Sequence, residues 1–490
     1  MKLMHSVANL RTLPSCNGYQ RSRQSVWPFQ LEGIATTPHS MKKALDLCVL
    51  ITGGAGGVGH HAVVRFLHAG YRVRSCDIRE PAVAFPEEVD FRLGDICDSS
   101  TMLEMCKGVD IVVHTAAMIC HFGRYDLVRS VNVVGTKVLL ECARRAGVRR
   151  FIHTSSVSVL YRGLEVSNNV SEDAFAEFYP VEKQVDDYIL TKQEGEKLVI
   201  DAHVDGKFST IAFRPGGIYG DGLLATDLML EMLIQRRFPT YAPDTKINWT
   251  SVDNLIDAYL LAADKRKWPV HGPMVLHDGS DGEKHNAIVD AMTQHCRISG
   301  PMIPICPPII LLYFIGWCNE IGYNVLSTLV RVPIPSLVRG RVLQIGTDRT
   351  FSCERAEKLL GYAPKERDTI AGHIAVLKGM EPKIHAMKEA YKVADALEYP
   401  SFAWMLFVMT GLPLCYLLSD THWLINYIWI GAAAIHIMYL PLASMLASFG
   451  KLYQTRILWS ILCMLFGFPC VALLYKRALR RRKSLQRRQL

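Results

Sequence analysis

Residues 50–59 read Leu-Ile-Thr-Gly-Gly-Ala-Gly-Gly-Val-Gly, and this stretch decides the fold. An apolar run ends at Ile51, and Gly53, Gly56 and Gly59 follow at three-residue spacing. This spacing is typical of a strand that turns tightly into a helix: the first glycine allows the turn, the second lets backbone approach a pyrophosphate, and the third lets helix and strand pack closely. Free backbone N–H groups and the helix dipole favour an anion at such a helix start.

The residues on either side of the loop support this interpretation. The run 47–51 is apolar throughout, as in a buried parallel strand, and Val63, Phe66 and Leu67 then recur at helical spacing before Gly70. We therefore predict a strand–loop–helix unit that binds a dinucleotide. The loop residues predicted to contact it are Thr52, Gly53, Gly56, Gly57, Val58 and Gly59.

A second predicted strand, residues 71–76, ends in Asp77. An acid about 20 residues beyond such glycines is placed to accept hydrogen bonds from both hydroxyls of the adenosine ribose, and it would repel a 2′-phosphate. Asp77 therefore favours NAD over NADP, and the nearby positive charge of Arg79 weakens this preference.

Short apolar runs continue to alternate with helical patterns, with strands predicted at 89–93, 110–114 and 151–156. This alternation predicts an α/β fold, a doubly wound parallel Rossmann sheet with helices on both faces. Open sheets of this kind bind ligands at the carboxyl ends of their strands. The further predicted cofactor contacts are Asp95 and Ile96 at the adenine, and Thr115, Ala116 and Ala117 below the ribose and phosphates.

A candidate catalytic pair follows one helix after the strand that ends at Ser156. Tyr188 and Lys192 stand at i and i+4, on one face of a predicted helix. With 19 tyrosines in the chain, about one such pair is expected by chance, so the spacing alone proves little. Its place in a chain that already carries the dinucleotide loop gives the pair its weight.

Hydride transfer from an alcohol carbon requires a base that takes the hydroxyl proton. A tyrosine pKa of about 10 is too high for this at neutral pH, but a lysine cation and a positive nicotinamide both favour the phenolate. Ser156 can hold the substrate oxygen, Lys192 can also donate to the nicotinamide ribose, and Asn132 can orient the lysine through water. The predicted catalytic residues are Tyr188, Lys192, Ser156 and Asn132, of which Tyr188 and Lys192 are also predicted cofactor contacts. The ordinary alternatives are a packed ring, a solvated lysine and a helix-capping serine.

Over roughly residues 46–380 the chain resembles the extended short-chain dehydrogenase/reductase superfamily. The matching stretches, in family order, are Thr52–Gly59, Asp77, residues 94–96, Ser155 with Ser156, Tyr188 with Lys192, and residues 213–220, 252–254 and 359–364. Within it the chain is most similar to the 3β-hydroxysteroid dehydrogenase branch, including the sterol-4α-carboxylate 3-dehydrogenases. That resemblance implies oxidation of a sterol 3β-hydroxyl with NAD, and further cofactor contacts at Pro215 and Gly216. Residues 248–251 depart from the aromatic and β-branched strand that is usual in the family. The resemblance therefore supports the cofactor site more than the substrate pocket.

Composition limits the other functions. The chain has 490 residues, is 50% apolar and carries a net charge of +9, but eight basic side chains at 476–488 supply nearly all of that charge. A nearly neutral body argues against nucleic-acid binding. The 14 cysteines are scattered without metal-ligand spacing, so we predict buried thiols in a reducing compartment and no metal.

The predicted domains are an extension at 1–45 that is disordered or a targeting segment, the cofactor and substrate domain at 46–395, membrane helices at 400–476 and a basic cytosolic tail at 477–490. Long apolar runs at 402–418, 423–449 and 457–475 have Trp and Tyr near their ends, as membrane segments do. We predict an endoplasmic reticulum membrane protein with a cytosolic catalytic domain. Three single crossings would instead make that domain lumenal, with Asn169 and Asn248 as glycosylation candidates.

The apolar run 307–318 is too short to span a bilayer. It is either a core helix or a flap that dips into lipid beside a sterol entrance.

The predicted partners are a sterol or other lipophilic small molecule and the membrane, with a homodimer left open. Alternative functions are a reductase of another lipid or phenolic carbonyl, a nucleotide-sugar epimerase with the same Ser/Tyr/Lys set, and a non-catalytic, redox-sensing membrane scaffold. An intact Tyr188–Lys192 pair counts against the scaffold, because a sensor does not need it.

Overall fold

The computed structural model describes residues 47–174, 178–234, 245–298, 308–329, 334–335, 337–365 and 367–395. The chain forms two compact units, Met1–Ile384 and His385–Leu490. In the second unit the described residues are the helical residues His385–Asp395, the C-terminal part of α14 (Glu381–Asp395). The fold described below belongs to the first unit.

A seven-stranded parallel sheet forms the centre of this unit, in the order β11-β7-β5-β4-β1-β2-β3. Its strands are β1 Cys48–Thr52, β2 Arg72–Asp77, β3 Asp90–Leu93, β4 Ile111–His114, β5 Arg150–Thr154, β7 Ser209–Pro215 and β11 Gly272–Leu276. β1 lies between two neighbours, since Val49 is in register with Val73 of β2 and with Ile111 of β4. The predicted doubly wound parallel sheet is therefore confirmed.

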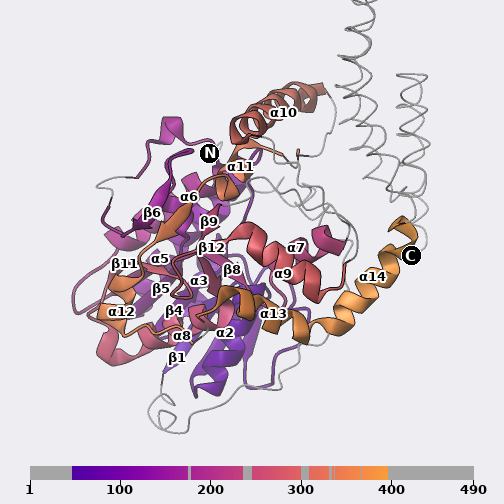
Figure 1. The fold of residues 1–490 in the computed structure, drawn as a ribbon. Helices are drawn as coiled ribbons and strands as arrows, with labels where there is room; N and C mark the ends of the chain where they lie inside the picture. The colour runs from indigo at the N-terminus through magenta and orange to yellow at the C-terminus, as the bar shows by residue number, and fades with distance from the viewer. Residues whose placement is uncertain are drawn as a thin grey trace, which may run out of the picture. The chain divides into compact units, whose positions relative to one another are not determined.

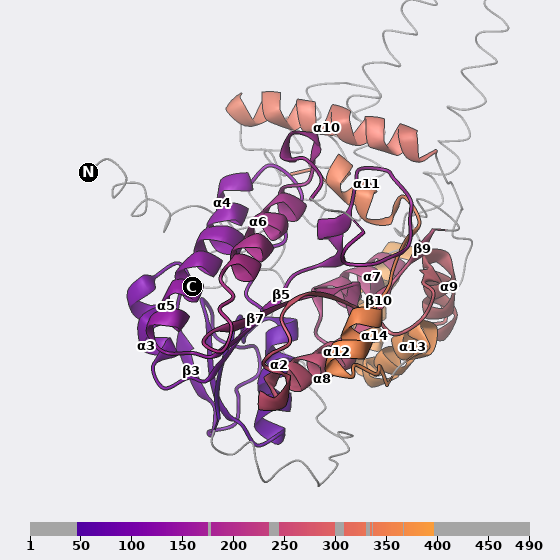
Figure 2. The same cartoon turned by 90° about the vertical axis from the view of Figure 1, so that its left-hand side faces the viewer.

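Helices cover both faces of this sheet (Figures 1 and 2). One layer contains α2 Gly57–His68, α8 Val252–Ala263 and α12 Glu354–Leu360, and the other contains α3 Ser99–Cys106, α5 Thr136–Arg145 and α6 Asp187–Asp201. Alternate residues of β1 serve the two layers: Val49 and Ile51 belong to one buried cluster, and Leu50 belongs to the other. This alternation explains why the strand is apolar throughout, because both of its faces are covered.

Most of the remaining elements form a smaller region at one side of the sheet, and the others pack against the helices already described. Its strands are β6 Ser167–Val170, β8 Gly217–Tyr219, β9 Lys246–Ile247, β10 Trp249–Ser251, β12 Glu283–Lys284 and β13 Arg349–Phe351, in sheets ordered β12-β9-β13-β6 and β10-β8. The other helices are α4 Tyr125–Arg129, α7 Leu224–Ile234, α9 His285–His295, α10 Ile309–Leu329, α11 Arg339–Ile345 and α13 Thr369–Gly379, with a π-helical turn Ser130–Gly135 and short 3-10 helices Val157–Leu160, Val181–Lys183 and Lys265–Lys267.

The stretch that departs from the family pattern is nevertheless a strand. Trp249 is buried in β10, and Thr250 donates to the Leu276 carbonyl. Asn248 is buried, and its amide bonds the Ser280 carbonyl and the Phe351 N–H. A side chain held in this way is a poor acceptor for glycosylation, whereas Asn169 in β6 is exposed.

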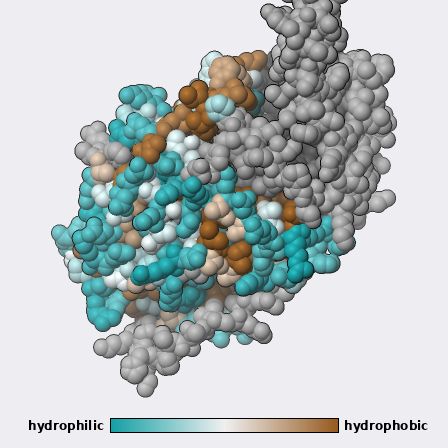
Figure 3. Space-filling model, in the orientation of Figure 1, coloured by the Kyte–Doolittle hydropathy of each residue, from teal (hydrophilic) through white to brown (hydrophobic). Residues whose placement is uncertain are grey.

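α10 presents an apolar face to solvent. It has 21 residues and continues well beyond the apolar run that suggests it in the sequence. Ile310 is 74% exposed, Phe314 53% and Trp317 43%. Hydrophobic residues gather along this helix on the molecular surface (Figure 3). The core-helix alternative is therefore wrong, because a core helix would bury these side chains.

The predicted membrane segments, the extension 1–45 and the basic tail lie outside the described residues. Within the described part of the chain, no helix combines the length and the apolar character that a membrane crossing requires.

Candidate active site

The glycine loop adopts the predicted strand–turn–helix geometry. Gly53 has a φ of +76°, and a Cβ there would lie 2.8 Å from the Ala116 Cα. A Cβ on Gly59 would lie 2.0 Å from the Gly53 carbonyl oxygen, so the helix approaches the loop too closely for any side chain. A Cβ on Gly56 would meet only the Gly53 oxygen, at 3.1 Å, and no side chain caps α2. The loop thus combines open backbone with free helix N–H groups, which suits a diphosphate.

A second segment packs against the same helix start. A Cβ on Gly57 would lie 2.5 Å from Leu223 Cδ2 and 2.8 Å from the Gly222 oxygen, and His61 Nε2 lies 2.9 Å from the Asp221 oxygen. The loop after β8 therefore borders the predicted phosphate site. No local pattern signals this contact, because it joins residues about 160 positions apart.

Asp77 lies at the end of β2, beside the glycine loop. Its Oδ2 accepts from the Ala55 N–H at 3.1 Å, and its Oδ1 accepts from the Arg79 N–H at 3.3 Å. Burial raises the pKa of this carboxyl, and the Arg79 cation acts in the opposite direction. These hydrogen bonds hold the carboxylate beside the position predicted for the adenosine ribose.

Thr52 is buried and does not face the loop. Its hydroxyl bonds His114 Nδ1 at 2.8 Å, His114 Nε2 bonds the Thr136 hydroxyl at 2.9 Å, and that hydroxyl donates to the Asn132 carbonyl. The Thr52 side chain is thus engaged within the fold, and its predicted contact with the cofactor stays a prediction. The hydroxyl instead ties β1 to the helix that carries Asn132.

The other predicted cofactor residues surround the carboxyl ends of the strands. Asp95 is exposed and accepts from the Cys97 N–H at 2.9 Å, whereas Ile96 is buried against Gly135. Thr115, Ala116 and Ala117 follow β4 and are at least partly accessible, with the Thr115 hydroxyl donating to the Thr52 carbonyl at 2.7 Å.

Pro215 and Gly216 end β7 and are buried. The Gly216 N–H donates to the Thr250 hydroxyl at 2.9 Å, and a Cβ there would lie 2.4 Å from the Asn248 oxygen. This glycine packs against the segment before β10, so the structure gives it a packing role.

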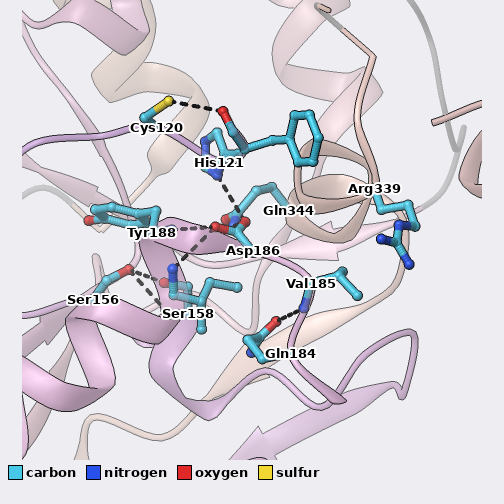
Figure 4. A network of polar contacts seen from close by, with 12 residues as sticks. Cys120, His121, Ser156, Ser158, Gln184, Val185, Asp186, Tyr188, Arg339 and Gln344 are labelled. Carbon is cyan, nitrogen blue, oxygen red and sulfur yellow. Dashed lines mark hydrogen bonds and ion pairs between the residues drawn. The ribbon is translucent and has the colours of Figure 1, made fainter. Parts of the chain in front are cut away.

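Tyr188, Lys192 and Ser156 converge, as Figure 4 shows for the tyrosine and the serine. Asp186 caps α6 by accepting from the Tyr188 N–H at 2.9 Å and the Ile189 N–H at 3.1 Å. Lys192 is buried, and its Nζ donates to the Thr154 carbonyl at 2.7 Å and lies 6.0 Å from the Tyr188 ring centre. Ser156 follows β5, its hydroxyl accepts from the Ser158 N–H at 3.2 Å, and its proximity to Tyr188 acts to lower the pKa of the phenol.

The electrostatics of the pair differ from the sequence-based expectation. Burial raises the pKa of Tyr188, the nearby Asp186 raises it further, and the nearby Ser156 hydroxyl acts in the opposite direction. Burial lowers the pKa of Lys192 to about 8, and Glu196 opposes that shift. In the free protein the phenol is therefore neutral, because desolvation outweighs the effect expected of the lysine.

Asn132 joins the loop after β4 to the residue before Lys192. Its amide oxygen accepts from the Met118 N–H at 2.8 Å, and its nitrogen donates to the Met118 carbonyl at 2.9 Å and the Thr191 hydroxyl at 3.0 Å. The side chain thus ties the loop after β4 to α6, and the orientation of the lysine through water stays a prediction. The π-helical turn that holds Asn132 has no signal in the sequence.

A buried ion pair lies one helical turn after Lys192. Arg214 donates to both carboxylate oxygens of Glu196, and their side chains are 4% and 0% exposed. Glu196 stands one turn after Lys192 on α6, and Arg214 belongs to the Arg-Pro stretch of β7. The i, i+4 spacing of Lys192 and Glu196 is the signal that sequence reasoning missed.

One group of metal-ligating side chains occurs in the described part of the chain: His203, Asp205 and His271. His203 Nδ1 accepts from the Thr210 N–H at 3.3 Å, so Nε2 carries the proton and donates to Asp205 at 2.9 Å. A metal at this nitrogen would have to displace the proton, because a histidine nitrogen ligates only in its deprotonated form. The group belongs to the loops before β7 and β11, at the opposite sheet edge from Tyr188.

Lys192 is expected to make stability depend on pH. Its pKa is about 8 in the folded protein and 10.5 in its unperturbed state, so the unfolded chain binds more protons between these values and folding becomes more favourable as pH rises. The Lys192→Met variant lacks this group, so it should not share the stability that the wild type gains as pH rises. Its melting temperature relative to the wild type should therefore fall as pH rises from about 8 to about 10. Thermal unfolding of both proteins over this range measures the difference; a constant difference would contradict the lowered pKa.

A parallel sheet with a glycine loop at β1, and a Ser/Tyr/Lys group beyond it, defines an enzyme of the extended short-chain dehydrogenase/reductase class. Residues 50–276 match the 3-beta hydroxysteroid dehydrogenase/isomerase family. The chain belongs to that family, as two groups of relatives also show.

The "Sterol-4-alpha-carboxylate 3-dehydrogenase, decarboxylating" of Mus musculus is 30% identical over 327 residues, which cover 65% of this chain and 86% of that protein. "Short-chain dehydrogenase/reductase family 42E member 1" of Bos taurus is 30% identical over 348 residues, covering 65% and 84%. Among solved structures, the UDP-glucose 4-epimerase of Thermotoga maritima has a TM-score of 0.53 at 18% identity, covering 69% of this chain and 100% of that chain. A dTDP-glucose 4,6-dehydratase of Streptomyces venezuelae, solved with NAD, has a TM-score of 0.52 at 20% identity, covering 69% and 97%. These structural likenesses support the fold.

Proposed function

We propose that this protein is an NAD-dependent dehydrogenase that oxidises the 3β-hydroxyl of a sterol. The observation that carries the proposal is the convergence of Ser156, Tyr188 and Lys192 beyond the end of β5, in the same sheet as the glycine loop. A serine donor, a phenol and a buried ammonium are the groups that removal of a hydroxyl proton requires.

The residues present fit the dinucleotide. Gly56 leaves open backbone at the start of an uncapped helix, where a diphosphate would be held. Asp77 presents a carboxylate for ribose hydroxyls, and the buried Ser155 hydroxyl lacks a hydrogen-bond partner among the described residues. When bound, the nicotinamide supplies the acceptor for a hydride from the carbinol carbon.

Each of the three converging side chains has its own role in the proposed reaction. Ser156 donates to the substrate oxygen and holds it beside the phenol. Tyr188 takes the hydroxyl proton, for which its pKa must fall from the raised value of the free protein. The Lys192 cation lowers the pKa of the phenol. Its hydrogen bond to the Thr154 carbonyl holds it on the face of α6 that carries Tyr188, and Glu196 favours its protonated form.

The sterol class rests on the relatives and on the surface of the smaller region. Among the relatives, the proteins named sterol-4-alpha-carboxylate 3-dehydrogenase act on sterols according to that name. α10 exposes Ile310, Phe314 and Trp317, the kind of face that enters the headgroup region of a bilayer. We therefore place the enzyme at the endoplasmic reticulum membrane with a cytosolic catalytic domain, where a lipophilic substrate would reach the site from lipid.

The cofactor preference tests Asp77. The wild-type protein should bind NADH more tightly than NADPH, because the partly buried carboxylate of Asp77 repels the 2′-phosphate. Asp77→Ser should reduce this preference at least tenfold, since Arg79 remains beside the site. Titration of both nucleotides by fluorescence measures the two dissociation constants; a tighter constant for NADPH in the wild type would overturn the assignment.

The substrate class is tested by a turnover panel with purified full-length protein, NAD, and alcohols of three kinds: 3β-hydroxysterols with and without a 4-carboxylate, flavonoids and sugar nucleotides. We expect NADH formation with the sterols. Turnover confined to sugar nucleotides would favour an epimerase-type enzyme and contradict the proposal.

A further inference from the structure

One carboxylate, that of Asp186, joins three parts of the protein two residues before Tyr188. Its Oδ1 caps α6 through the N–H groups of Tyr188 and Ile189. Its Oδ2 accepts from His121 Nδ1 at 2.9 Å and from Gln344 Nε2 at 3.2 Å (Figure 4). The side chain is fully buried, and among the described residues these hydrogen bonds compensate it for the loss of water.

The first donor belongs to the loop after β4, and this loop is also in contact with the tyrosine. The His121 ring meets the Tyr188 ring edge to face, with centres 5.8 Å apart. Next to it, Phe122 meets Tyr323 of α10 in the same manner at 5.6 Å. This loop thus connects the surface helix to Asp186.

The second donor belongs to α11, which is fastened to α10. Glu320 of α10 is buried and accepts from the Arg339 N–H at 2.7 Å and from its Nε at 2.6 Å. Gly316 lets the two helices approach, because a Cβ there would lie 2.9 Å from the Arg339 nitrogen. The two helices are therefore held together, and α11 carries Gln344.

We propose that Asp186 is a positioning residue for Tyr188, through which α10 and α11 set the orientation of the phenol. Two routes from α10, through Phe122 with His121 and through Arg339 with Gln344, end on the same oxygen. A change in α10, as when substrate enters beside it, shifts the start of α6 and with it the tyrosine ring. The proposal rests on the proposed function, because it assigns the catalytic role to Tyr188.

Two variants each remove one donor and keep the size of the side chain: Gln344→Met and His121→Phe. Arg341→Met, an exposed position on α11, is the matched control. Hydrogen exchange of the full-length protein, followed by mass spectrometry of peptides that cover 186–192, reads the order of the first turn of α6 without any substrate. Steady-state kinetics with NAD and the active sterol of the panel gives kcat, which depends on the position of the phenol.

We expect each variant to exchange at least fivefold faster in this peptide and to lose about tenfold in kcat, with the NAD dissociation constant unchanged. The melting temperature should fall in both variants, because a fully buried carboxylate loses one of its donors. The double variant should lose less than the product of the two single effects, because both act through one oxygen. The control should match the wild type.

Exchange and kcat within twofold of the wild type in either folded variant would overturn the proposal, as would fully multiplicative losses in the double variant. If the wild type turns over no alcohol in the panel, the proposed function fails, and the exchange measurement still decides whether Asp186 orders the start of α6.

Discussion

Tyr188→Phe should lower kcat for sterol oxidation by about 10³-fold or more, which corresponds to about 4 kcal/mol of transition-state stabilisation. The substitution removes the phenol oxygen and keeps the ring, so the contact with His121 and the helix cap on Asp186 remain. The dissociation constant for NAD should change less than threefold. Stopped-flow measurement of NADH formation and titration of cofactor binding test the two parts separately.

A matched tyrosine provides the control. Tyr125 donates from its hydroxyl to Glu194 at 2.9 Å on the other side of α6, so Tyr125→Phe should retain turnover within twofold of the wild type. Substantial turnover by Tyr188→Phe, at a tenth of the wild-type rate or above, would remove this residue as the base.

Glu196→Gln should lower the free energy of unfolding by about 3 kcal/mol or more, because breaking a buried ion pair leaves the other charge without compensation. The charge left behind is the Arg214 guanidinium, whose side chain is 4% exposed. Activity should fall as well, since Glu196 raises the pKa of Lys192 and its loss leaves less of the lysine charged. Chemical unfolding and kcat measure the two effects.

The same substitution on the solvent side of α6 shows whether burial is the cause. Glu194 pairs with Arg129 at 3.0 Å, and these side chains are 29% and 43% exposed. Glu194→Gln should therefore cost less than about 1 kcal/mol. Equal losses in the two variants would contradict the account of the buried pair.

Local patterns predict the cofactor half of the fold well. The apolar run at 47–51 and the glycine spacing identify β1 and α2, because strand burial and close backbone approach each act within a few residues. The helix that places Tyr188 and Lys192 on one face is also predicted, since a spacing of four residues brings their side chains together.

The electrostatics of the site depend on contacts that no local pattern contains. The raised pKa of Tyr188 comes from burial and from Asp186, and the second route to that carboxylate begins at Gln344, 158 residues away. Asn132 is selected by its place in a motif, but its partners Met118 and Thr191 are set by the packing of a loop against α6. The length of α10 is also missed, because its second half is less apolar than the run that reveals it.

The central claim is that a hydride leaves the sterol carbinol carbon while Tyr188 takes the hydroxyl proton. The most direct test supplies a 3β-hydroxysterol with deuterium on that carbon and measures the mass of the reduced cofactor. We expect one deuterium in the NADH formed by the wild-type protein, and formation of this NADH about 10³-fold slower with Tyr188→Phe. Unlabelled NADH, or no NADH from any 3β-hydroxysterol although NAD binds, would contradict it.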